Sequence, residues 1–137
     1  MKVIVVGYDG TEPSKRALER AADIAAAFGS RVVVTSVAPV MMGSGHPTGA
    51  VDPSDPPEKH QAELEEAHAY LAGRNVQAEL QPAEGDADDV IVQVAEEVGA
   101  TLIVVGTREL GLVSRLLGQS VSGSVSRHAH CDVLIVH

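Results

Sequence analysis

Short apolar runs alternate along the chain with longer segments in which apolar residues recur every three or four positions. The runs at 2–7 (KVIVVG), 31–38 (RVVVTSVA) and 101–106 (TLIVVG) are rich in β-branched residues and predict strands covered on both faces. Residues 75–81 (NVQAELQ) alternate polar and apolar, which is typical of a half-exposed strand near a sheet edge. Residues 132–136 (DVLIV) supply the last predicted strand.

The intervening segments have the spacing of amphipathic helices. The first begins after Thr11, where a hydroxyl residue, an acid and Pro13 together indicate a helix start, and it ends at Gly29, a typical left-handed cap. Further helices are predicted over 58–71, between Gly85 and Gly99, and over 120–128. The apolar positions that predict the buried helix faces are Ala17, Leu18, Ala21, Ile24, Ala25 and Phe28, then Ala62, Leu64 or Glu65, Ala67 and Leu71, and finally Ile91, Val94, Ala95 and Val98.

The alternation of strands with helical crossovers predicts an α/β fold, a five-stranded parallel sheet with helices on both faces. Residues 1–137 suit one domain with one hydrophobic core. One segment departs from the pattern. Seven of the seventeen residues from Met41 to Pro57 are Gly or Pro, which predicts a mobile loop.

The last predicted strand, Asp132 to Val136, is as apolar as the buried strands. A strand at the end of the chain often forms the edge of such a sheet, and an exposed apolar edge pairs readily with another strand. We therefore predict a homodimer formed through this edge.

Composition and charge exclude several classes of function. Ten Lys and Arg against nineteen Asp and Glu give a net charge of −9, the wrong sign for a nucleic-acid partner. No run reaches the roughly 18–20 apolar residues of a membrane span, and the start lacks the layout of a signal peptide, so we expect a cytoplasmic protein without a membrane partner. Cys131 is the only cysteine and cannot form an internal disulfide. With 2% aromatic residues, aliphatic side chains must build the core.

Two predicted strand ends carry residues suited to ligand binding, which in open α/β sheets occurs outside the carboxyl ends of strands. Asp9 follows the first strand, either as a ligand group or as a cap of the turn. Gly106 opens a glycine-bearing loop that leads to Ser120 and a helix start. Backbone amides at such a start bind anions, although a loop merely capped by Ser120 has the same sequence.

These residues resemble the universal stress protein family, single-domain type. The resemblance covers the whole chain and rests on VGYDGTEPSKRAL, TLIVVGTRELG and LLGQSVSGSVSRHAHCDVLIV. It implies a Rossmann-like sheet of the adenine nucleotide alpha hydrolase kind, with strand order 3-2-1-4-5. It also implies a dimer through the last strand and binding of ATP, with Mg²⁺, between the ends of the first and fourth strands. In the leading hypothesis, bound ATP changes the 41–57 loop and thereby the choice of protein partner in a stress response.

The family's phosphate loop has the pattern G-x2-G-x9-G-[ST], and the resemblance implies contacts residue by residue. The adenosine end would be held by Gly7, Asp9, Val37 and Val105, and the ribose and phosphates by Gly106, Arg108, Gly118, Gln119, Ser120, Val121 and Ser122.

Two residues depart from this pattern. Glu109 and Gln119 stand where the family has its second and third glycines. A carboxylate about 5 Å from a phosphate charge costs about 3 kcal/mol at an effective dielectric near 20. The alternative function is therefore that of a family member that has lost ATP binding and acts as a dimeric interaction scaffold.

A flavin-binding domain is the third hypothesis. It is disfavoured because few aromatic rings are present to hold the flavin.

No pattern in the sequence indicates catalysis. It lacks a P-loop lysine motif and a nucleophile with a base at a recognisable spacing, so we do not expect an enzyme. His128, His130 and Cys131 are too few and too close in sequence for a metal site. The acids at 86, 88 and 89 suit the first turn of a helix, where they complement its dipole.

Overall fold

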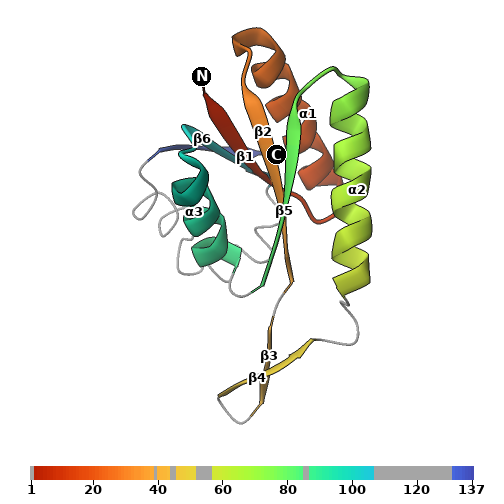
Figure 1. Cartoon of the computed structure of the whole chain (residues 1–137), viewed down its shortest axis with the longest axis vertical. Helices are drawn as coiled ribbons and strands as arrows, with labels where there is room; N and C mark the ends of the chain where they lie inside the picture. The colour runs from red at the N-terminus through yellow and green to blue at the C-terminus, as the bar shows by residue number, and fades with distance from the viewer. Residues whose placement is uncertain (1, 39, 44–45, 52–56, 85–86, 107–130) are drawn as a thin grey trace.

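The computed structural model describes residues 2–38, 40–43, 46–51, 57–84, 87–106 and 131–137 (Figure 1). In chain order its elements are β1 (Val3–Gly7), α1 (Glu12–Phe28), β2 (Arg31–Ala38), β3 (Val40–Gly43), β4 (His46–Val51), α2 (Pro57–Gly73), β5 (Ala78–Glu84), α3 (Ala87–Val98), β6 (Leu102–Gly106) and β7 (Asp132–Val136). The helix predicted over 120–128 lies outside the described residues.

The main sheet has the order β5-β2-β1-β6-β7, and each neighbouring pair in it is parallel. This is the predicted order 3-2-1-4-5 of the five predicted strands, which is thereby confirmed. β1 lies at the centre, where Val5 pairs with Val33 on one side and Ile103 on the other. The half-exposed β5 and the chain-terminal β7 form the two edges, as their sequences predict.

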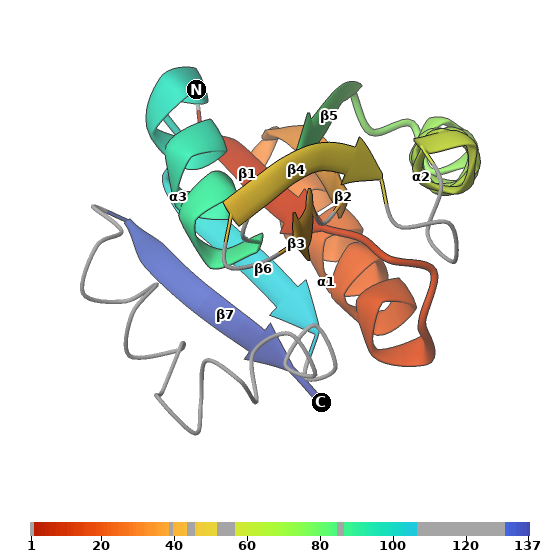
Figure 2. The same ribbon diagram turned by 90° about the horizontal axis from the view of Figure 1, so that it is seen from below.

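Helices cover both faces of this sheet (Figures 1 and 2). Side chains of α1 and α2 pack with Ile4, Val6 and Val34 on one face. Residues of α3 pack with Val5 and Val33 on the other face. Both cores are built almost entirely from aliphatic residues, as predicted, and strand alternation assigns successive residues of β1 and β2 to opposite faces.

The predicted start and end of the first helix are confirmed. Thr11 is the N-cap of α1, and its hydroxyl accepts a hydrogen bond from the Ser14 amide. Gly29 ends the helix with φ 65°, in the left-handed region, and its amide donates to the carbonyl of Ala25.

Two positions predicted for the buried helix faces are wrong. Phe28 is 67% exposed, because it is the last residue of α1 and extends past the core; the Lys2 ammonium lies 5.6 Å from its ring centroid. Ala62 is exposed as well, and Glu63 is buried in its place beside Leu64. A carboxylate is accommodated there because Ser36 donates a hydrogen bond to it.

The prediction of a loop over 41–57 is also wrong for 41–43 and 46–51, which form strands, whereas residues 44–45 and 52–56 lie outside the described residues. β3 and β4 pair antiparallel and form a separate two-stranded sheet, which extends away from the end of β2 (Figure 1). Pro47 is tolerated because each strand of a two-stranded sheet has one unpaired edge. The third strand of the main sheet begins at Ala78 rather than at residue 75, since Asn75 has φ 56° and forms part of the turn before it.

At Gly106 the end of β6 and the first turn of α1 approach each other closely. A Cβ atom on Gly106 would lie 2.5 Å from the carbonyl carbon of Pro13 and 2.8 Å from the Ser14 amide nitrogen. These are backbone atoms of the first turn of α1, so no side-chain rotation relieves the clash. The first turn of α1 thus packs directly against the end of β6.

We expect Gly106→Ala to lower the free energy of unfolding by about 1–3 kcal/mol through overpacking. Urea denaturation measures this change. Gly73→Ala is the matched control, because nothing lies within 4 Å of the added methyl. The control variant should be unchanged or more stable by up to about 1 kcal/mol. Equal stability of Gly106→Ala and the wild type would contradict the close approach.

Candidate functional site

The carboxyl ends of three neighbouring strands define the candidate site. Gly7 ends β1 and pairs with Thr35 of β2, whereas Val105 and Gly106 end the adjacent β6. The order of the strands therefore brings Gly7, Val105 and Gly106 to one edge of the sheet, although about a hundred residues separate them in sequence. Val37 lies two residues beyond Thr35 on β2 and continues past the end of β1.

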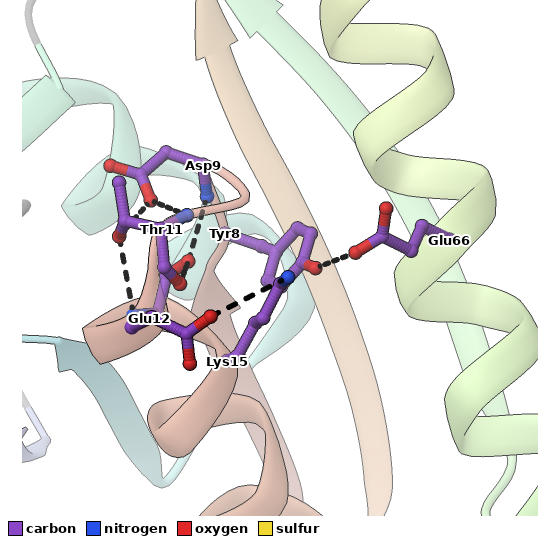
Figure 3. A network of polar contacts seen from close by, with 7 residues as sticks. Tyr8, Asp9, Thr11, Glu12, Lys15 and Glu66 are labelled. Atoms are coloured by element: carbon purple, nitrogen blue, oxygen red, sulfur yellow. Dashed lines mark hydrogen bonds and ion pairs between the residues drawn. The ribbon is translucent and has the colours of Figure 1, made fainter.

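Asp9 occupies the turn between β1 and α1 (Figure 3). Its Oδ1 accepts hydrogen bonds from the amide and the hydroxyl of Thr11, and its own amide donates to Ser14 Oγ at 3.3 Å. The turn-capping interpretation of Asp9 is thus correct for one carboxylate oxygen. Within the part of the chain that the structure describes, Oδ2 has no hydrogen-bond partner, so the half-buried carboxylate keeps one oxygen for another group.

Tyr8 connects this turn to α2. Its side chain is 3% exposed, and its hydroxyl donates to Glu66 Oε1 (Figure 3). Burial disfavours the phenolate and, together with the Glu66 hydrogen bond and the charges of Glu66, Glu63 and Asp9, raises the pKa of Tyr8 well above its ordinary value. The tyrosine is therefore a hydrogen-bond donor throughout the physiological pH range.

Glu63 and Ser36 form a second polar contact between α2 and the sheet. Ser36 Oγ donates to Glu63 Oε2 at 3.0 Å, and both residues are buried. The turn rests against the same carboxylate, since a Cβ on Gly10 would lie 3.7 Å from Glu63 Cγ. Gly10 has φ 79°, which a side chain rarely adopts, so glycine is required there.

Sequence reasoning missed the residues that give this edge its polarity: Tyr8, Thr35, Ser36, Glu63 and Glu66. A partial signal was present, since Thr35 and Ser36 interrupt an otherwise apolar strand. Burial of Glu63 had no such signal, because helical spacing alone does not show which turn of α2 meets a hydroxyl. The carboxylates and hydroxyls together make this edge rich in hydrogen-bond acceptors.

Several predicted site residues lie outside the described residues, namely Arg108, Gly118, Gln119, Ser120, Val121 and Ser122, and so does Glu109. Val37 is described only as part of the β2 backbone.

Among the described side chains, no three His, Cys, Asp or Glu residues are grouped as a metal ion would require. No helix in the described ranges is long and apolar enough to cross a membrane.

Comparisons with known proteins identify relatives along the whole chain. The profile of the universal stress protein family matches residues 1–137. A universal stress protein of Mycobacterium tuberculosis is 38% identical, over 99% of this chain and 96% of its own length. One crystal structure, of a universal stress protein in complex with cAMP, has a TM-score of 0.75 at 32% identity and covers 99% of this chain and 97% of its own. The structure of a universal stress protein from Archaeoglobus fulgidus has a TM-score of 0.77 at 25% identity, covering 100% and 94%.

The pKa of Tyr8 gives a direct test of this arrangement. The Tyr70→Phe variant keeps Tyr8 as its only tyrosine and has no tryptophan, so near-ultraviolet absorbance follows Tyr8 alone. We expect no ionisation until the pH is well above 10.0, the ordinary value. Because the folded state holds the proton more tightly, this contribution to stability is complete below the ordinary pKa and is lost as the pH rises above it, by at most about 1.4 kcal/mol per pH unit.

The free energy of unfolding of Tyr8→Phe should not show this fall as the pH rises above 10.0. Ionisation of Tyr8 in the folded protein near its ordinary pKa would show that its hydroxyl is neither buried nor paired with Glu66.

Proposed function

Because the chain belongs to the universal stress protein family, we propose that it binds an adenine nucleotide at the carboxyl ends of β1, β2 and β6, with ATP and Mg²⁺ as the ligand in the cell. The solved relative in complex with cAMP, 32% identical to this chain, supports an adenine nucleotide. The observation that carries the proposal is Asp9, whose Oδ2 has no partner among the described residues at the strand end where this fold binds ligands.

The charge distribution supports one orientation of the nucleotide. Glu63 and Glu66 lie on the side of α2, whereas Asp9 lies in the turn between β1 and α1 and points away from Glu66 (Figure 3). These carboxylates repel phosphates, and the Asp9 carboxylate accepts hydrogen bonds from hydroxyl or amino groups. The adenosine end therefore lies near Asp9 and Gly7. The phosphates lie toward Gly106, where the family resemblance implies contacts from Arg108 and from Ser120 to Ser122.

The proposed role is regulated binding rather than catalysis. The hairpin of β3 and β4 continues from β2, the strand whose end forms part of the proposed site (Figure 1). A nucleotide held there is adjacent to the base of the hairpin and alters the surface that it offers to a protein partner. β7 is an edge strand of the sheet, and the proposed homodimer forms through its free edge, Asp132 to Val136.

Asp9→Asn tests the site without dismantling the turn, because the amide oxygen still accepts from Thr11. We expect the variant to keep its stability and to bind ATP about ten- to a hundredfold more weakly in calorimetric titration, since a charge-assisted hydrogen bond is lost. Asp23→Asn is the matched control, on the exposed side of α1 where Asp23 pairs with Arg74. The control should bind as the wild type does.

Two outcomes would contradict the proposal. Equal affinity of Asp9→Asn and the wild type would remove Asp9 from the site. No wild-type binding of ATP, ADP or AMP at millimolar concentration would favour the alternative, a dimeric scaffold without a nucleotide.

Glu109 tests the predicted phosphate end. If its carboxylate faces the phosphates, Glu109→Gln and Glu109→Gly should both raise the affinity for ATP, by up to about a hundredfold, and the affinity for AMP by less. Parallel titrations with the two nucleotides measure the difference. Unchanged affinity in both variants would mean that the Glu109 carboxylate points away from the ligand.

A further inference from the structure

The Thr35 side chain carries a buried hydroxyl that has no partner in the described part of the chain. The residue is fully buried, and Oγ1 makes no hydrogen bond there. Its neighbour Ser36 is equally buried, but donates to Glu63. Because an unpaired buried hydroxyl is costly and rare in native proteins, the Thr35 hydroxyl needs a specific explanation.

Thr35 lies on the face of the sheet that holds the proposed adenosine contacts. Val33, two residues earlier on β2, packs in the same core as Val5 and Val105. Strand alternation places Thr35 on that face, and its register partner is Gly7, which has no side chain to cover it. The hydroxyl therefore lies on the α3 side of the sheet, level with the end of β1.

The position of this hydroxyl is held firmly by the backbone. The carbonyl of Thr35 accepts a hydrogen bond of 3.0 Å from the Tyr8 amide, the residue directly before Asp9. β2 is also paired on its other side, where Thr35 is opposite Gln81 of β5. A group fixed on both sides in this way is preorganised for a ligand and loses little freedom on binding.

The surroundings of Thr35 suit a base rather than a phosphate. On this face the register partners of Thr35 are Gly7 and Gln81. The core residues Val5, Val33 and Val105 on the same face are aliphatic, so none of these neighbours carries a positive charge that would attract a phosphate. A hydroxyl both donates and accepts, and so matches the ring nitrogens and the amino group of a purine. We propose that the Thr35 hydroxyl hydrogen-bonds the base of the bound nucleotide and is a specificity-determining contact of the site; this inference rests on the proposed function.

Thr35→Val removes the hydroxyl and keeps the shape and the β-branching of the side chain. In calorimetric titrations we expect AMP, ADP and ATP to bind about five- to tenfold more weakly, by the same factor for all three, because they share the base. The unliganded variant should melt at a temperature higher by about 2–4 °C, since a buried unpaired hydroxyl has been removed. A combination of higher stability and weaker binding is not expected from a merely structural residue.

Two further variants serve as controls. Thr35→Ser keeps the hydroxyl and should retain the affinity within about twofold. Thr101→Val removes a hydroxyl that donates to the Val3 carbonyl at the amino end of the parallel strands, so it should lower the melting temperature slightly and leave the affinity unchanged.

The outcomes separate this inference from the proposed function. Wild-type binding with an unchanged affinity in Thr35→Val would overturn the inference alone, and would indicate that the hydroxyl pairs with a buried water. A loss of affinity that grows with the number of phosphates would also overturn it. No wild-type binding of any of the three nucleotides would overturn the proposed function and this inference together.

Discussion

Parallel pairing of β1 with both β2 and β6 is the constraint on which the rest of this molecule depends. Val5 and Val6 are wholly buried because strands flank them on both sides and helices cover both faces. Parallel neighbours require crossovers, and those within the described residues contain helices, with α1 and α2 on one face of the sheet and α3 on the other. The same pairing sets Gly7, Thr35 and the end of β6 side by side.

The two faces of the sheet are chemically different at its carboxyl edge. On the side of α2, Tyr8 and Ser36 donate to the carboxylates of Glu66 and Glu63, which makes an acidic, hydrogen-bonded layer. On the side of α3 the core is aliphatic, and the buried hydroxyl of Thr35 has no hydrogen-bond partner among the described residues. The proposed nucleotide, whose base contacts Thr35, lies on the α3 side of this edge, away from the acids on the side of α2.

The close packing of α1 against the end of β6 also shapes the carboxyl edge of the sheet. Gly106 is glycine because the backbone of Pro13 and Ser14 occupies the space of a side chain. The first turn of α1, the Asp9 turn and the end of β6 consequently form one compact unit. Among the residues proposed to hold the nucleotide, Asp9 and Gly106 are thus positioned by contacts with the first turn of α1.

The sequence by itself determined the strands of the main sheet, their order through the family resemblance, and the beginning and end of α1. These features follow from local patterns: β-branched runs, a hydroxyl N-cap and a glycine in the left-handed conformation. It also located Asp9, Gly7 and Gly106 at strand ends. Only the tertiary structure decided that Glu63 is buried, that Phe28 is exposed and that Thr35 has no partner among the described residues. Each of these depends on which side chain from a distant segment lies opposite, and neither composition nor periodicity along one chain contains that information.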